Sequence, residues 1–279
     1  MIRFIVRRLL QSVPLLLVIS LLIFALIHAA PGGPLSTYLE NPNVRPEDIE
    51  RLRRAMGLDR PLGVQYLSWL RAFVQGDWGY SFISRVDVDS LILQRVPVTL
   101  AVIGASQVLA LLIALPIGII SAVRPYSWFD RIFSTLAFVG FSLPTFFSGI
   151  LLILLFSITL DWLPFVYRAD IAATGWEWWW LHIKQSIMPV TVLGLFQGAS
   201  WMRYVRSAVL DVIKLDYVTT ARSKGLKERV VVMKHVVRNA LIPVVTLVAL
   251  QMPAVFGGAI VTEQIFRIPG IGSLLIDAI

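Results

Sequence analysis

Residues 96–123, VPVTLAVIGASQVLALLIALPIGIISAV, contain no Asp, Glu, Lys or Arg, and this stretch decides the fold class. A helix needs about 20 apolar residues to cross the roughly 30 Å hydrocarbon core of a bilayer, so the stretch is long enough to span one. Four further stretches without these charged residues reach or approach that length: residues 9–30, 132–160, 185–202 and 239–262. The sequence therefore predicts an all-α protein, a polytopic bundle of transmembrane helices.

The overall composition agrees with a membrane protein. Hydrophobic residues make up 57% of the chain and charged residues 15%, against about 25% charged in soluble domains. The chain has no cysteine, which excludes disulfides, thiolate metal sites and a cysteine nucleophile. Arg3, Arg7 and Arg8 precede residues 9–30, as in a signal peptide, but this apolar run exceeds the 7–15 residues of a signal core and favours a first transmembrane helix.

The distribution of Lys and Arg predicts the orientation of the chain. With the N-terminus in the cytoplasm, the inner segments carry a large excess of bases, and the outer segments carry slightly more acids than bases. The net charge of +8 is thus a topology signal and does not indicate a nucleic-acid partner. Five spans would leave the C-terminus outside, so we expect a sixth span after Ile279, and a five-span protein is the open alternative.

Residues 31–95 are predicted to form a small helical extracytoplasmic segment between the N-terminal region, residues 1–30, and a core domain, residues 96–279. An amphipathic helix should begin at Pro46 and end near Gly57, and a second should cover residues 63–74. This layer could cover the outer mouth of a pore, meet a delivery protein, or be a folded plug. The tryptophans at 176 and 178–180 indicate an interfacial anchor or, alternatively, a carbohydrate or peptide platform.

Several kinds of chemistry have no support in this sequence. No acidic residue lies within the five stretches, which argues against a proton- or sodium-coupled carrier. The phosphate-binding pattern G-x-x-x-x-G-K-[ST] does not occur, nor do the hydrolase patterns His-Glu-x-x-His and Gly-x-Ser-x-Gly. His28, His182 and His235 are scattered and are expected to be interfacial or capping residues. We therefore expect a transport subunit that is not an enzyme and holds no metal or cofactor itself.

A few mild polar residues remain in the spans, accompanied by Pro116, Pro144 and Pro253. Small polar groups can serve helix packing or line a water-filled path, and both interpretations stay open. A path with so little fixed charge suits a large, chemically varied solute better than a bare ion. The candidate pathway residues are Gln107, Ser142, Thr145, Gln197 and Gln251.

The segment between the last two stretches is long and basic. Residues 216–224 and 227–234 are each predicted to form a short helix, with Gly225 as the left-handed turn between them. Such a helix–glycine–helix unit could dock on a partner whose acids pair with its bases. It could also lie on anionic lipid headgroups.

This segment resembles the Glu-Ala-Ala loop of binding-protein-dependent ABC importers, in the form of the peptide/nickel permeases. The matching residues are Thr-Ala-Arg-Ser-Lys-Gly at 220–225 and His-Val-Val-Arg-Asn-Ala-Leu-Ile-Pro at 235–243, with Thr219 where the loop signature has Glu. One departure is Gly33, where the family often has Asp. Further matches in chain order are residues 7–10, 57–62, 65–66, 76–82, 96–100, 257–259, and Glu263-x-x-Phe266-x-x-Pro269-Gly270.

The resemblance implies a permease subunit of the bacterial or archaeal inner membrane that pairs with a second homologous permease subunit. Two cytoplasmic ATPase subunits, which bind ATP and Mg, would grip the loop within residues 207–238, and an extracytoplasmic binding protein would deliver peptides. Gly225 would set the turn and Ala221 would permit close approach. The loop residues implied in coupling are Asp216, Thr219, Thr220, Ala221, Arg222, Lys224, Gly225, Leu226, Glu228 and Arg229.

Two other functional classes remain open at the level of sequence. An ATP-independent channel or carrier would move solute by itself. A membrane scaffold would bind partners through the basic loop without moving solute. The solute is also open, since dipeptides, oligopeptides, glutathione, nickel chelates and sugars are all carried by relatives in the resembled family.

Overall fold

The computed structural model describes residues 2–31, 33–35, 45–81, 83–257 and 259–278, without the side chains of residues 46 and 254–257. Phe82 and Gly258, which belong to the matched motifs, lie outside the described residues. The chain divides into two compact units, Met1–Asp89 and Ser90–Ile279, and each is described by itself.

The first unit is helical, with one small hairpin. It contains α1 (Ile2–Ala29), a 3-10 turn (Gly33–Leu35), α3 (Pro46–Ala55), α4 (Leu62–Val74) and the antiparallel strands β1 (Tyr80–Ser81) and β2 (Val86–Asp87). The predicted helices at Pro46 and at residues 63–74 are confirmed, and Gly57 has the left-handed φ of 66° expected of a helix-ending glycine. Two hydrogen bonds join α4 to α1. Tyr66 Oη lies 2.9 Å from Ser20 Oγ, and Gln65 Oε1 lies 3.0 Å from His28 Nε2.

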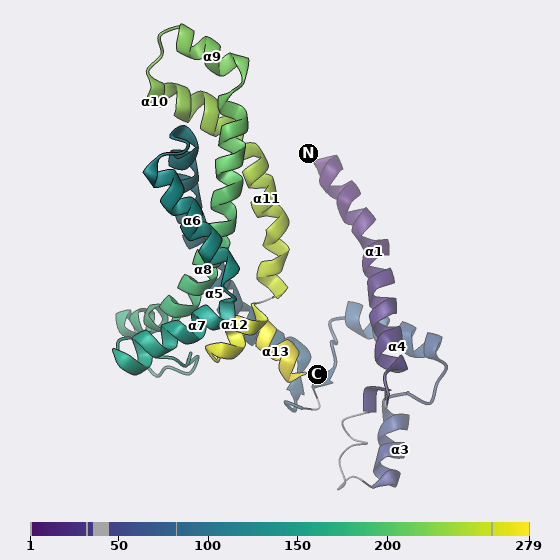
Figure 1. Cartoon of the computed structure of the whole chain (residues 1–279). Helices are drawn as coiled ribbons and strands as arrows, with labels where there is room; N and C mark the ends of the chain where they lie inside the picture. The colour runs from purple at the N-terminus through teal and green to yellow at the C-terminus, as the bar shows by residue number, and fades with distance from the viewer. Residues whose placement is uncertain (1, 32, 36–44, 82, 258, 279) are drawn as a thin grey trace. The chain divides into compact units, whose positions relative to one another are not determined.

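The second unit is a helical bundle (Figure 1). Its elements are α5 (Val88–Val123), α6 (Trp128–Ser142), α7 (Thr145–Leu152), π-helical η2 (Ile153–Thr159), α8 (Trp176–Ile213), α9 (Asp216–Ser223), α10 (Glu228–Val230), π-helical η3 (Val231–Val237), α11 (Arg238–Gly257), α12 (Ile260–Ile265) and α13 (Ile271–Asp277). Figure 1 shows α9 and α10 at one end of this bundle, and α7, α12 and α13 at the other.

Helices α5 and α8 approach each other closely at two glycines. A Cβ atom on Gly118 of α5 would lie 2.8 Å from the Val205 side chain of α8, and a Cβ on Gly194 of α8 would lie 2.7 Å from Leu109 of α5. Since real Cβ contacts are not that short, the two helices can pack at this distance only with glycine at both positions. Small residues at helix contacts are typical of membrane bundles.

The prediction of a continuous span over residues 132–160 is wrong, because the helix breaks at Leu143 and Pro144. Leu143 has an extended backbone, with φ −78° and ψ 125°, as expected for a residue before proline. The helices on either side, Trp128–Ser142 and Thr145–Thr159, are bent by 99° and count at most as one broken span or a re-entrant loop.

In the part of the chain that the structure describes, fewer than five helices qualify as spans by length and hydropathy alone. Among the described residues, three helices are long and apolar enough to cross a membrane, Ile2–Ala29, Val88–Val123 and Glu228–Pro253, or four with the bent pair. Helix α8, which contains the predicted stretch 185–202, falls below this hydropathy limit because Gln185, Gln197 and other polar groups interrupt it, but its 38 residues are long enough to cross a bilayer. The predicted stretch 239–262 is not one helix either, because α11 ends at Gly257 and α12 begins at Ile260.

Candidate functional site

The α9–α10 segment, residues 214–238, projects from one end of the second unit (Figure 1). Helix α9 ends at Ser223, and Gly225 follows with φ +75°, its N–H donating to Arg222 O at 2.9 Å. Helix α10 then begins at Glu228 and continues as η3. The predicted helix–glycine–helix unit is confirmed, with boundaries within about one residue at α9 and at the start of α10.

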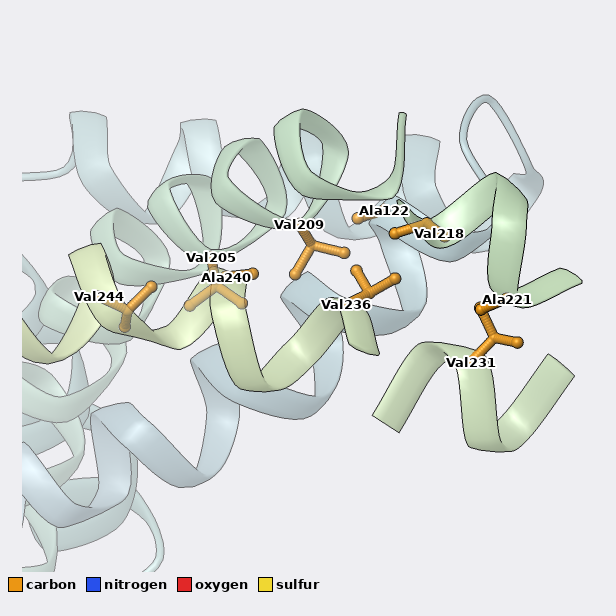
Figure 2. Packing of buried hydrophobic residues seen from close by; sticks show 9 residues of the cluster. All are labelled: Ala122, Val205, Val209, Val218, Ala221, Val231, Val236, Ala240 and Val244. Carbon is orange, nitrogen blue, oxygen red and sulfur yellow. The ribbon is translucent and has the colours of Figure 1, made fainter. Parts of the chain in front are cut away.

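The inner face of this segment is packed onto the bundle. Val218, Ala221, Val231 and Val236 are buried in one cluster with residues of α5, α8 and α11 (Figure 2). The other members are Ala122, Val205, Val209, Ala240 and Val244. The side chain of Ala221 therefore lies within this chain's own core, next to Val231, a placement that sequence reasoning missed. The spacing of three residues between Val218 and Ala221 indicates one buried face on α9, but it does not identify what covers that face.

The outer face of the segment is exposed. Apart from Ala221, every loop residue singled out from the sequence lies on it: Asp216, Thr219, Thr220, Arg222, Lys224, Gly225, Leu226, Glu228 and Arg229. Arg222 and Glu228 pair across the glycine turn, with Nη2 donating to Oε1 at 2.7 Å and Nε to Oε2 at 3.2 Å. In the described part of the chain, Lys224 and Arg229 form no ion pair.

The pairing of Arg222 with Glu228 favours the charged form of both side chains. The hydrogen bond between the two side chains raises the pKa of Arg222 and lowers the pKa of Glu228 relative to their ordinary values. Because both side chains are exposed, an ion pair of this kind contributes only about 0.2–1 kcal/mol to stability. Its main structural effect is to fix the turn, and it leaves the positive charges of Lys224 and Arg229 available on the surface.

A polar triplet joins α9 to the start of α11. Asn239 Nδ2 donates to Tyr217 Oη and to the backbone oxygen of His235, both at 2.9 Å, and Tyr217 Oη donates to the same oxygen at 3.3 Å. This network gives Asn239 of the His-x-x-Arg-Asn motif a structural role. The imidazole rings of His28 and His182 each form a hydrogen bond with a backbone oxygen four residues earlier. His28 lies in the last turn of α1, as a capping residue does, whereas His182 lies inside α8.

Two of the five candidate pathway residues are brought together. Gln251 Oε1 of α11 accepts hydrogen bonds from the Gln197 amide and, at 2.9 Å, from Trp201 Nε1, both on α8. Ser142 bonds the oxygen of Phe138 in its own helix, and Thr145 begins α7 beyond the bend. Gln107 has a buried side-chain oxygen without a hydrogen-bond partner among the described residues. The five residues thus do not form one site.

The structure reveals two carboxylates that sequence reasoning did not single out as sites. Asp130 of α6 binds Arg206 of α8 through both oxygens, at 2.7 and 2.8 Å. Glu263 of α12 is only 2% exposed, although the sequence placed it just beyond a span and only as part of a motif. The available sequence signal for this burial was the pair Gly270 and Gly272, because side chains at these two positions would collide with the Glu263 carboxyl group.

Comparison with known proteins places the chain among transport components. The family model described as binding-protein-dependent transport system inner membrane component matches residues 114–279, and the model of the N-terminal part of such components matches residues 1–103. The chain is 41% identical over 277 residues to the oligopeptide transport system permease protein AppB of Bacillus subtilis (strain 168), covering 99% of this chain and 86% of that protein.

Two further relatives are similar over the full length of this chain. A putative peptide permease protein of Brucella suis biovar 1 (strain 1330) is 42% identical over 287 residues, with 88% of its length covered. The glutathione transport system permease protein GsiC of Salmonella choleraesuis (strain SC-B67) is 39% identical over 279 residues, with 87% covered.

Proposed function

This chain belongs to the family of inner membrane components of binding-protein-dependent transport systems, and on that premise we propose that it forms half of the peptide pathway of an ATP-driven importer. A second permease subunit supplies the other half, and an extracytoplasmic binding protein delivers the peptide. Two cytoplasmic ATPases dock on the α9–α10 segment, and the N-terminus lies in the cytoplasm too, as the distribution of Lys and Arg predicts.

The observation that carries this proposal is the two-sided build of the α9–α10 segment. Its buried face is continuous with the core of α8 and α11, and its exposed face presents Lys224, Leu226 and Arg229. A partner with acidic groups around an apolar groove would complement that face. Because the segment and the end of α8 share one packed core, a displacement of the docked partner would move α8 with it.

The motion would reach the rest of the bundle through α8. This helix packs against α6 and α11, and it holds α6 through the Asp130–Arg206 pair and α11 through Gln197, Trp201 and Gln251. ATP-driven closure of the partner would therefore shift several helices together. This is alternating access between two conformations, biased by a ligand that binds one of them better.

Peptides are the proposed solute. Three relatives are named for transport of oligopeptides, peptides and glutathione. The polar groups placed in the bundle interior by Gln197 and Gln251 are uncharged amides, which can exchange hydrogen bonds with peptide groups without selecting a side-chain charge.

The test is reconstitution with and without partners. We expect an ATPase to copurify with the chain, and peptide uptake into liposomes to require the ATPase, ATP and the binding protein. Replacement of residues 216–229 by a flexible Gly/Ser linker should abolish both copurification and uptake. Uptake by the two permease subunits alone would identify a channel or carrier, and partner binding without uptake would identify a scaffold.

A further inference from the structure

The buried carboxylate of Glu263 joins three helices at the end of the second unit opposite the α9–α10 segment (Figure 1). Its Oε1 accepts a hydrogen bond from Thr99 Oγ1 of α5 at 3.1 Å, and its Oε2 accepts one from the Ser273 N–H of α13 at 2.8 Å. Thr99 Oγ1 in turn accepts from the Ile271 N–H at 2.8 Å. Glu263 and Thr99 thus connect the α12–α13 hairpin, residues 260–277, to α5.

The hairpin is built around this carboxylate. A Cβ atom on Gly270 would overlap the Glu263 carboxyl group, and a Cβ on Gly272 would lie 2.9 Å from Glu263 Oε2. A side chain at either position would have to displace the carboxylate from its two donors. The glycines therefore leave room for the acid, which indicates that the position of the carboxylate is a requirement of this hairpin.

The same hairpin contacts the bent helix pair. Phe266 is 2% exposed, its backbone oxygen accepts from the Tyr167 N–H at 3.0 Å, and a Cβ on Gly149 of α7 would lie 3.3 Å from its ring. Arg95, one turn before Thr99 on α5, donates to Ser273 Oγ at 3.4 Å. The hairpin is therefore held between α5 on one side and α7 on the other.

A carboxylate is an expensive way to hold an apolar hairpin. Burial of a charge costs free energy unless hydrogen bonds compensate it, and a carboxylate can accept about four hydrogen bonds, of which the described residues supply two. Apolar packing would hold the hairpin permanently at lower cost. Two directed hydrogen bonds instead define one position of the hairpin and can be exchanged for water when the site opens.

We propose that Glu263 is a positioning residue whose contact with Thr99 holds the α12–α13 hairpin against α5, and that this contact breaks when the pathway opens at this end. The inference rests on the proposed transport function, because it makes the hairpin a moving part of the transport cycle. The Glu263–Thr99 contact then stabilises one conformation of the permease at the end remote from the docked ATPases.

The experiment compares Thr99→Val, which keeps the shape of the side chain and removes its hydroxyl, with Thr99→Ser, which keeps the hydroxyl. The chain has no cysteine, so spin labels can be placed at Leu93→Cys on α5 and Leu275→Cys on α13, both exposed. The distance distribution is measured by double electron–electron resonance on the full chain, with its permease partner, in lipid nanodiscs.

We expect Thr99→Val to broaden and lengthen the distribution, and Thr99→Ser to match the unsubstituted residue. Loss of a hydrogen bond to a charged group should shift the equilibrium between the two hairpin positions by about tenfold or more. In the complex with ATPases, the number of peptides taken up per ATP hydrolysed should fall for Thr99→Val at unchanged complex yield. A purely structural role would instead lower yield, uptake and ATP hydrolysis in parallel.

Identical distributions and identical coupling ratios for Thr99→Val and the unsubstituted chain would overturn the proposal. If Thr99→Val does not accumulate in the membrane, Glu263→Gln, which keeps volume and removes the charge, gives the same measurement with the same labels. The nanodisc distances do not involve an ATPase, so failure of the proposed transport function, seen as no copurifying ATPase, is distinguishable from failure of the hairpin contact.

Discussion

At the scale of single residues, the backbone conformation at Gly225 favours glycine. Its φ of +75° is a left-handed conformation, and no atom lies within 4 Å of where a Cβ would be, so a substitution meets strain and not a clash. A β-branched side chain in that conformation costs roughly 1–2 kcal/mol, whereas Asn tolerates it. A comparison of Gly225→Val with Gly225→Asn therefore distinguishes the effect of the turn geometry from the effect of adding a side chain.

We predict that Gly225→Val uncouples peptide uptake from ATP hydrolysis, because it reorients α10 relative to α9 on the docking face. Gly225→Asn should retain most of the uptake. The measurement is ATP-dependent uptake and ATPase activity in proteoliposomes containing equal amounts of assembled complex. Equal uptake for Gly225→Val and the unsubstituted protein would contradict the role given to this turn.

Gln251 is the second residue whose role can be tested singly. Its Oε1 accepts from both Gln197 and Trp201, so Gln251→Leu would leave two donors unpaired between α8 and α11. An unsatisfied buried donor costs about 1–3 kcal/mol, and we predict a lower thermal denaturation midpoint. Thr246→Leu, on the exposed side of the same helix, is the matched control and should leave the midpoint unchanged.

At the scale of elements, the sequence predicted the pieces of the α9–α10 segment but not how they pack. Charge, glycine and helical period located two short helices around Gly225. The buried contact of Ala221 with Val231 depends on how α9 folds back onto η3, which no local pattern specifies. The straight span over residues 132–160 failed for a local reason, because Pro144 disfavours a helical backbone at Leu143 and the helix ends there.

The contact between α6 and α8 is also a tertiary feature. Asp130 is nearly buried, Arg206 is about a quarter exposed, and Asp130 also accepts from the Tyr126 N–H at 2.8 Å. In the sequence the two residues are far apart, and each appears only as one charge among the inner segments. Because removal of one partner of a buried pair costs roughly 3–5 kcal/mol, this pair should couple the two helices measurably.

We predict a coupling free energy above about 1 kcal/mol in a double-mutant cycle of Asp130→Asn and Arg206→Gln. The amide oxygen introduced by Asp130→Asn can still accept from the Tyr126 N–H, so the cycle isolates the pair itself. The matched control is the exposed pair Glu50 and Arg54, 3.3 Å apart on α3, for which the cycle should give a value near zero. Additive effects of the Asp130 and Arg206 substitutions on unfolding would contradict a connection between α6 and α8 through this pair.

At the scale of the whole molecule, composition and the long uncharged stretches predicted the fold class. A polytopic helical membrane protein follows from the long uncharged stretches, and the helical bundle of the second unit confirms it. The central position of α8 could not be predicted in this way. A helix surrounded by other helices can carry Gln185, Gln197 and Trp201 without facing lipid, so hydropathy alone does not identify its environment.

The orientation of the chain in the membrane is a prediction of the charge distribution that labelling can test. Single cysteines at Thr219, on the exposed face of α9, and at Asp170, in the loop before α8, can be introduced without background because the chain has none. With the N-terminus inside, a membrane-impermeant maleimide should label Asp170→Cys in spheroplasts and Thr219→Cys only in inside-out vesicles. Addition of the partner ATPase should then protect Thr219→Cys, since the ATPase docks on that face, and should not affect Asp170→Cys. Labelling of Thr219→Cys in intact spheroplasts would place the α9–α10 segment outside the cell, where no ATP-driven partner could act on it.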